Sequence, residues 1–189
     1  MGLNCLALAC SPRRHGNTSI LARKALDGCR DAGGKTDFLY LTDYSYVPCR
    51  ACGGCDKTGK CVVKDDAAQL FEKILACDRF ILAAPIFSMG ICAQAKGFID
   101  RAQQFWAFKY LLGRRLFDSS QRKGIYISCA GTRLPRVFDG ALQVARYFFM
   151  IMEIELAATC CYPGVDAKGE VGKAPEILED VYDLGRKLV

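Results

Sequence analysis

Short apolar segments alternate with amphipathic ones along the chain, and this alternation constrains the fold more than any other feature of the sequence. The first segment, Leu3–Ala9, is an almost continuous apolar run, which is typical of a central strand covered on both faces of a sheet. Strands that alternate with helices predict an α/β fold in which parallel strands are joined by right-handed crossovers. Five such strands suit a doubly wound sheet of order 2-1-3-4-5 with helices on both faces.

The boundaries of these elements follow from the apolar pattern and from glycine and proline positions. The predicted strands are Leu3–Ala9, Thr36–Leu41, Arg79–Ala84, Lys123–Ser128 and Ile154–Cys161. The predicted helices are Ile20–Ala32, a segment opened by Asp65 and Asp66, Ala93–Trp106, a segment with an apolar side from Val137 to Met152, and Pro175–Leu188.

The composition fits a single globular domain over residues 1–189. This length is sufficient to bury a substantial core, and 51% hydrophobic with 24% charged residues is an ordinary globular balance. Lys and Arg outnumber Asp and Glu by 26 to 20, giving a net charge of +6, but the basic residues are scattered along the sequence. Because they form no stripe with interleaved aromatic residues, we expect no nucleic-acid partner.

No stretch of the sequence predicts a membrane span. A transmembrane helix needs about 20 consecutive apolar residues, and the longest candidate, residues 80–95, is interrupted by Pro85, Ser88 and Gly90. We therefore expect no membrane partner and a cytoplasmic location. In a reducing compartment, closely spaced cysteines are more often metal-binding or redox-active than paired in disulfides.

The segment after the first strand, residues 11–19 (SPRRHGNTS), has the composition of an anion-binding loop. It contains neither a GxGxxG motif nor a Walker lysine, which argues against an ordinary dinucleotide or a nucleoside triphosphate. Its hydroxyls, free backbone N–H groups and position before a helix suit a terminal phosphate monoester. The candidate ligands are Ser11, Arg13, Asn17, Thr18 and Ser19, and Asn17 is also the expected helix cap. The alternative is a plain turn and helix cap, with Arg13 only solvated.

Two other predicted loops reach the same edge of the sheet, because ligands of doubly wound sheets lie outside the carboxyl ends of the strands. Pro85–Gly90 follows the third strand, and its backbone can approach a flat heterocycle while Phe87 or Met89 packs against it. Cys129–Gly131 closes the fourth strand. The charged residues of the motif KGFIDR at 96–101 either position the preceding loop or form a surface salt bridge.

Four of the twelve cysteines, Cys49, Cys52, Cys55 and Cys61, lie in one segment with the spacing CxxCxxCx5C. We expect them on a cysteine-rich loop over residues 47–64, after the second strand. Three cysteines at this spacing supply a cuboidal iron-sulfur cluster compactly. Structural zinc sites more often use two separated CxxC pairs. A redox-active dithiol, or a loop that binds nothing, stays open as an alternative.

The other eight cysteines lie in predicted strands, helices or strand ends, where cysteine packs as a small hydrophobic residue. Among them, only Cys129 lies at a predicted site. His15 is the single histidine, and we interpret it as an exposed turn residue. The lack of a second histidine argues against a histidine-based metal site and against a serine hydrolase triad.

These motifs resemble a known family. Residues 11–19, the sequence APIF at 84–87 and KGFIDR at 96–101 are similar to the flavodoxin-like NADPH-dependent FMN reductases. The cysteine spacing, followed by two aspartates, resembles more narrowly the iron-sulfur flavoproteins of anaerobic archaea and bacteria. The resemblance covers Leu3–Arg101 with specific motifs and rests on element order beyond Gly131. It implies a flavodoxin-like fold.

The resemblance also implies a set of cofactor-binding residues. The FMN phosphate would be held by Ser11, Arg13, Asn17, Thr18 and Ser19. The isoalloxazine ring would lie over Pro85, Ile86, Phe87, Ser88, Met89 and Gly90, with Cys129, Ala130, Gly131 and Thr132 near its other edge. A [4Fe-4S] cluster would be held by Cys49, Cys52, Cys55 and Cys61. Phe87 stands where the family commonly has tyrosine, which puts a proton-donor role at this position in doubt.

The implied function is that of an FMN-dependent oxidoreductase that relays electrons between a [4Fe-4S] cluster, FMN and a small-molecule acceptor. A ferredoxin-like protein or NAD(P)H is the implied donor, and quinones, oxygen and peroxide are the implied acceptors. Homodimers or homotetramers are implied as well, and the aromatic run Phe105–Leu112 is either core or a subunit contact. The alternatives are a cluster-free NAD(P)H-dependent FMN, quinone or azo reductase, and a non-enzymatic electron carrier or redox-responsive module.

Overall fold

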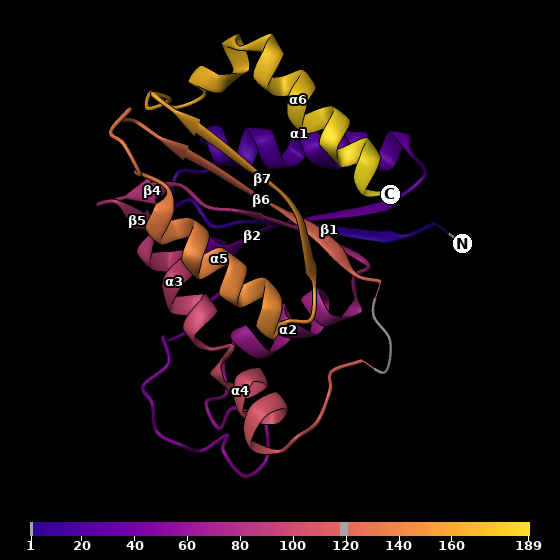
Figure 1. Ribbon diagram of the computed structural model, residues 1–189, viewed down its shortest axis with the longest axis vertical. Helices are drawn as coiled ribbons and strands as arrows, with labels where there is room; N and C mark the ends of the chain where they lie inside the picture. Colours follow the sequence, from indigo (N-terminus) through magenta and orange to yellow (C-terminus); the bar gives the residue numbers. More distant parts are fainter. Residues whose placement is uncertain (1, 118–120) are drawn as a thin grey trace.

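A five-stranded parallel sheet forms the centre of the computed structural model, which describes residues 2–117 and 121–189 (Figure 1). Its strands are β2 (Lys35–Tyr40), β1 (Asn4–Ala9), β3 (Arg79–Ala83), β6 (Lys123–Ala130) and β7 (Glu155–Pro163), given in their spatial order. Counted within this sheet, the order is 2-1-3-4-5, which confirms the predicted doubly wound topology.

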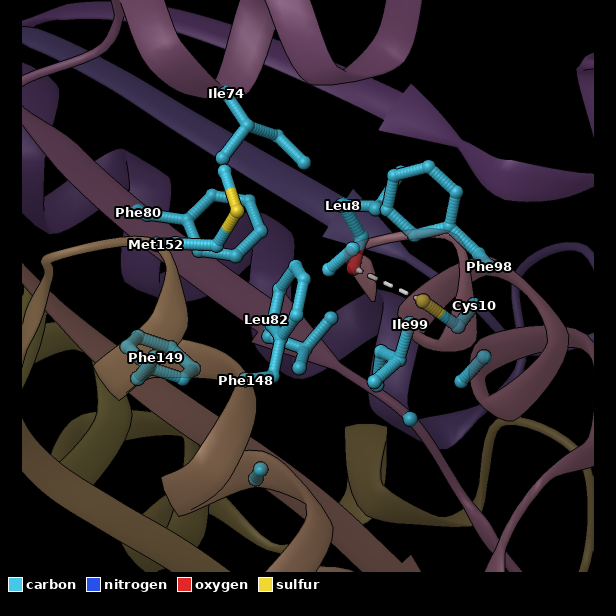
Figure 2. Close-up of a cluster of buried hydrophobic side chains, with 14 of the residues drawn as sticks. Leu8, Cys10, Ile74, Phe80, Leu82, Phe98, Ile99, Phe148, Phe149 and Met152 are labelled. Atoms are coloured by element: carbon cyan, nitrogen blue, oxygen red, sulfur yellow. Dashed lines mark hydrogen bonds between the residues drawn. The ribbon is translucent and has the colours of Figure 1, made fainter. Parts of the chain in front are cut away.

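Side chains of β1 alternate between two hydrophobic cores, one on each face of the sheet. Leu6 and Leu8 belong to the core beneath α2, α3 and α5, whereas Cys5 and Ala7 belong to the core beneath α1 and α6. Figure 2 shows the first core, where aromatic side chains surround Leu8 and Leu82. The helices are α1 (Asn17–Asp31), α2 (Ala67–Ala76), α3 (Ala93–Asp100), α5 (Asp139–Ile151) and α6 (Pro175–Leu188).

Several predicted boundaries differ from those of the structure, most of them by one to three residues. Helix α1 begins at Asn17 and is capped by Gly16, so Asn17 is not the N-cap residue. The predicted helix Ala93–Trp106 is two helices, because the chain turns at residues 101–102 between α3 and the short α4 (Gln103–Trp106). A π-helical turn, η2 (Ala107–Leu111), follows α4. The predicted strand Thr36–Leu41 is shifted by one residue, and η1 (Leu41–Asp43) follows it as a 3₁₀-helix.

The predicted loop after β3 contains a two-stranded hairpin, β4 (Ile86–Phe87) and β5 (Gly90–Ile91). Ser88 and Met89 form its turn in the left-handed region, with φ of 48° and 63°. Two positive φ values in a two-residue turn match the twist of antiparallel strands. The hairpin therefore fixes Phe87 and Met89 on a short ribbon that projects from the sheet edge.

The aromatic run Phe105–Leu112 divides between core and surface. Phe105 and Ala107 are buried, whereas Tyr110 and Leu111 are about half exposed, at 48% and 51%. The first half is thus core, and the second half leaves apolar surface beside the π-helical turn. No helix in the described part of the chain is both long and apolar enough to cross a membrane.

Helices α1 and α6 approach closely because glycine stands at the crossing. A Cβ atom at Gly185 would lie 1.9 Å from the carbonyl oxygen of Ala25, and one at Gly28 would lie 2.1 Å from that of Tyr182. Backbone atoms cannot yield as a flexible side chain can, so any larger residue must push the helices apart.

We expect Gly185→Ala to lower the free energy of unfolding by about 1–3 kcal/mol, the usual effect of overpacking. Gly172→Ala is the matched control, because no atom lies within 4 Å of a Cβ built at Gly172. Urea denaturation of both variants measures the difference. Equal stability of the two variants would contradict close backbone packing at the crossing.

Candidate functional site

The loops that follow β1, β3, β6 and β7 enclose one pocket of about 220 Å³ at the carboxyl ends of the strands. Of the predicted cofactor-binding residues, those that line it are Ser11, Arg13, Asn17, Thr18, Pro85, Ile86, Phe87, Cys129 and Gly131. Those that do not line it are Ser19, Ser88, Met89, Gly90, Ala130 and Thr132. The structure therefore brings the three predicted loops together around one cavity.

Two buried hydroxyls at the start of α1 have no hydrogen-bond partner in the described structure. Thr18 and Ser19 are 2% and 0% exposed, and neither Thr18 Oγ1 nor Ser19 Oγ makes a hydrogen bond. A buried polar group without a partner costs about 1–3 kcal/mol. Thr18 also lines the pocket, so an anion bound at this helix N-terminus would accept a hydrogen bond from the unpartnered Thr18 hydroxyl.

The segment after β7 forms a wall of the pocket that the sequence did not reveal. Val165, Asp166 and Lys168 line the cavity. The Asn17 side chain holds this segment, donating to the Ala167 carbonyl at 2.9 Å and accepting from the Val171 N–H at 3.2 Å. The available signal was the pair of glycines at positions 164 and 169, which adopt φ of 77° and 79° and let the chain turn back over the site.

Arg13 and His15 take different positions in the first loop. Arg13 Nη1 donates to the Asp166 carbonyl at 3.2 Å, so its guanidinium lies at the pocket wall. His15 is an exposed turn residue with φ of 56°, and its Nδ1 lies 3.4 Å from the Tyr40 hydroxyl. His15 is therefore not part of the pocket lining.

The opposite side of the pocket is apolar. The Ser128 hydroxyl donates to the Ala84 carbonyl at 2.8 Å and fixes the start of the loop that carries Phe87. Phe87 is 42% exposed and lines the cavity. Burial raises the pKa of the Cys129 thiol to about 12, and the neighbouring Cys161 adds to the shift. Cys129 is therefore protonated at neutral pH and presents a thiol, not a thiolate.

The four cysteines of the loop line a second hollow of about 400 Å³, together with residues of the turn after α3. All four thiols are free. Gly59 has φ of 68°, and a Cβ there would lie 2.5 Å from the Phe108 ring, so this position requires glycine. Among residues 2–117 and 121–189, no three His, Cys, Asp or Glu side chains are arranged to hold one metal ion.

A buried arginine fastens both ends of the cysteine loop. Arg101 Nη1 donates to the Val47 carbonyl at 2.8 Å and to Asp65 Oδ2 at 2.6 Å, and Nη2 donates to the Val63 carbonyl at 3.3 Å. Asp65 in turn accepts the Val47 N–H at 3.1 Å. Lys96, by contrast, pairs with Asp100 at the surface. The hydrogen bonds of Arg101 therefore hold the cysteine loop and not the preceding loop Pro85–Gly90, and the Lys96–Asp100 pair is the surface salt bridge of the alternative.

The electrostatic environments of the loop residues differ. The backbone N–H of Gly54 lowers the pKa of the exposed Cys52, whereas burial and the Asp56 carboxylate raise the pKa of Cys55. Partial burial raises the pKa of Asp65, but hydrogen bonds from Arg101 and from the N–H groups of Val47 and Ala67 outweigh it and hold that pKa below 3.8. Asp65 is thus ionised against the Arg101 guanidinium at neutral pH.

The kinds of donor present match the two groups that the sequence implied, although the four cysteines are not arranged, within the described residues, to hold one metal ion. Unpartnered hydroxyls at a helix N-terminus suit a phosphate monoester, and the adjoining apolar wall suits a flat ring system. The cysteine hollow offers four sulfur donors, with no histidine or carboxylate needed to complete a set of four. Pocket and hollow have no lining residue in common.

Comparison with known proteins is consistent with both features. Residues 3–132 match the family model of NADPH-dependent FMN reductases. An iron-sulfur flavoprotein of Methanocaldococcus jannaschii is 35% identical over 98% of this chain and 95% of its own length. An iron-sulfur flavoprotein of Archaeoglobus fulgidus is 31% identical over 94% of this chain and 75% of its own.

Among solved structures, an azoreductase of Bacillus anthracis superposes with a TM-score of 0.70 at 19% identity. The match covers 99% of this chain and all of the azoreductase chain. At this identity the likeness concerns the fold alone, and it agrees with the predicted flavodoxin-like topology.

We expect Asp65→Asn to lower the free energy of unfolding by about 1–3 kcal/mol, because it leaves the buried Arg101 without its counter-charge. The destabilisation should shrink as the pH falls below 3.8, the ordinary carboxyl value. The folded-state pKa of Asp65 is lowered, so the wild-type protein gains stability from it above that pH and loses the gain as Asp65 becomes protonated.

The matched control is Asp100→Asn, which removes a carboxylate from the exposed Lys96–Asp100 pair of α3. It should change stability by about 0.5 kcal/mol or less. Urea denaturation of the three proteins between pH 3 and pH 7 makes the comparison. A pH-independent loss in Asp65→Asn would rule out the ionised pair as its cause.

Proposed function

Because the chain belongs to the NADPH-dependent FMN reductase family and, within it, to the iron-sulfur flavoproteins, we propose that it relays electrons between a [4Fe-4S] cluster, FMN and a small-molecule acceptor. It is a flavin-dependent oxidoreductase. When bound, FMN supplies one- and two-electron chemistry and the cluster supplies single electrons, whereas the protein positions both and sets their potentials.

The observation that carries the FMN assignment is the unpartnered Thr18 Oγ1, which lines the pocket at the N-terminus of α1, next to the equally unpartnered Ser19 Oγ. We assign the phosphate to residues Ser11, Arg13, Asn17, Thr18 and Ser19. The Asn17 side chain is engaged with Ala167 and Val171, so Asn17 contributes through its backbone N–H. We assign the ring to residues Pro85, Ile86, Phe87, Ser88, Met89 and Gly90, with Cys129, Ala130 and Gly131 at its other edge.

The phenylalanine at position 87 limits the part that this side chain can play beside the proposed flavin ring. Its side chain is apolar and borders the pocket, so it can pack against the ring but cannot move a proton. The protonated Cys129 thiol faces the same cavity. Any proton that bound FMN chemistry requires would come from solvent, because the side chain of Phe87 cannot supply it and the Cys129 thiol, with a pKa of about 12, is a weak acid.

We assign the cluster to Cys49, Cys52, Cys55 and Cys61, which share one hollow. A ferredoxin-like protein or NAD(P)H is the proposed donor. The cysteine loop carries four exposed basic residues, Arg50, Lys57, Lys60 and Lys64, against one exposed acid, Asp56. This excess of positive charge favours an acidic protein as the one-electron donor.

A homodimer or homotetramer is proposed because pocket and hollow share no residue within one chain. Exposed Tyr110 and Leu111 lie on the turn that packs on the cysteine loop through Phe108, and they offer apolar surface for a second copy. A stable monomer containing both cofactors, found by sedimentation, would contradict this electron path. The single domain and the cytoplasmic location stay predictions.

We expect Thr18→Val to weaken FMN binding on the order of tenfold to a hundredfold, because a hydrogen bond to a charged phosphate contributes about 1.5–3 kcal/mol. Thr159→Val on the exposed side of β7 is the control and should bind FMN as tightly as wild type. Flavin fluorescence quenching with apoprotein measures both affinities. Equal dissociation constants would remove Thr18 from the phosphate site.

The deciding experiment is anaerobic purification with iron, sulfide and flavin analysis. We expect about four irons and four sulfides per chain, as one [4Fe-4S] cluster requires, with bound FMN. Cys52→Ser should lose most of the iron and keep FMN, whereas Cys161→Ser, outside the loop, should keep both.

Yellow, iron-free wild-type protein that oxidises NAD(P)H would instead favour a cluster-free FMN, quinone or azo reductase. Protein that carries both cofactors but turns over with no acceptor would favour a carrier or a redox-responsive module.

A further inference from the structure

Arg101 does more than fasten the cysteine loop. We infer that its free Nε–H group donates to sulfur at Cys61 and that its charge makes the bound cluster easier to reduce. This inference rests on the proposed function, since it concerns a cluster held by the four loop cysteines. Arg101 acts through those cysteines and is therefore a positioning residue.

The hydrogen bonds of Arg101 leave one donor unused. The two terminal nitrogens serve Val47, Val63 and Asp65, as described above. Nε is buried and has no hydrogen-bond partner among the described residues. The residue as a whole is only 2% exposed, so water does not reach this group freely. An arginine N–H group shielded from water and left without an acceptor is unfavourable. Such a donor indicates that an acceptor is missing from the bare protein.

The cysteine hollow provides a hydrogen-bond acceptor for this Nε–H group. Arg101 and Cys61 both line this hollow. Burial lowers the pKa of Arg101, but Asp65 and the nearby Cys61 outweigh burial and raise it, which places Cys61 within reach of the guanidinium. The backbone of Cys61 is fixed as well, because its N–H donates to Gln104 Oε1 at 3.1 Å. Sulfur at Cys61 is thus the acceptor that the geometry provides.

A guanidinium in this position would change the reduction equilibrium. Reduction of a bound cluster by one electron from the donor would add one negative charge at the hollow. A permanent positive charge at the wall stabilises the more negative state, and an N–H···S hydrogen bond acts in the same direction. Asp65 offsets part of this charge, but it does not line the hollow. Arg101 should therefore raise the midpoint potential of the cluster.

The test compares three variants of the cofactor-loaded protein. Arg101→Met removes the charge and all of its N–H donors, whereas Arg101→Lys keeps a charge beside Asp65 and loses Nε. Lys73→Met is the matched control, because it removes a positive charge from an exposed ion pair, Lys73–Asp37, neither member of which lines the hollow. Redox titration with dithionite and mediators, followed by electron paramagnetic resonance of the reduced cluster, gives each midpoint potential.

We expect Arg101→Met to shift the reduction equilibrium about tenfold toward the oxidised cluster, which is ~59 mV for one electron. Arg101→Lys should shift it in the same direction by less, and Lys73→Met should match wild type. Iron release to a chelator should be faster in both Arg101 variants, with FMN content unchanged. If Arg101→Met fails to fold, Arg101→Lys still carries the comparison.

Unchanged potential and iron release in Arg101→Lys and Arg101→Met would overturn the inference, as would a parallel loss of FMN and iron. After either of these two outcomes, the proposed function would still hold if the wild-type protein contains a cluster. Wild-type protein without a cluster would defeat the proposed function itself, and this inference with it.

Discussion

The parallel register of the sheet is the constraint on which the candidate site depends. Hydrogen bonding continues past the strand ends: the Cys10 N–H donates to Ala83, the Ala84 N–H to Ile127 and the Val165 N–H to Ala130. These bonds hold the first residue of each loop against its neighbour, so loops separated by more than a hundred residues meet at one edge. The pocket is therefore built on backbone that can move little without breaking the sheet.

Much of the fold was predictable because its causes are local and periodic. The run Leu3–Ala9 is apolar at successive positions because β1 is covered on both faces, and the final helix, Pro175–Leu188, begins at a proline suited to a first helical turn. The errors have tertiary causes. Helix α3 ends at Asp100, before Arg101, whose side chain is committed to the cysteine loop. Asn17 has the composition of a cap, but its amide binds the segment after β7 instead.

The parts of the candidate site that could be predicted are those whose functional groups lie close together in the sequence. Hydroxyls beside a helix start, or cysteines at a fixed spacing, are visible in one short stretch of sequence. Val165, Asp166 and Lys168 are ordinary loop residues, and only the path of the chain after β7 brings them to the pocket. Likewise, the sequence shows Arg101 only as a charged residue of the motif KGFIDR. Its hydrogen bonds to the Val47 and Val63 carbonyls become visible only in the structure.

The two proposed cofactor sites rest on different supports. The walls of the strand-end pocket come from loops at the ends of the strands. Residues 44–66, all described by the structure, form no helix or strand, and their tertiary contacts include Arg101 and Gln104. Weakening these contacts should loosen the cysteine loop without altering the strand order or the pocket. The proposed cluster site would thus vary in affinity and potential while the proposed flavin pocket stays constant. One sheet can therefore support flavin chemistry with a tunable single-electron centre or without one.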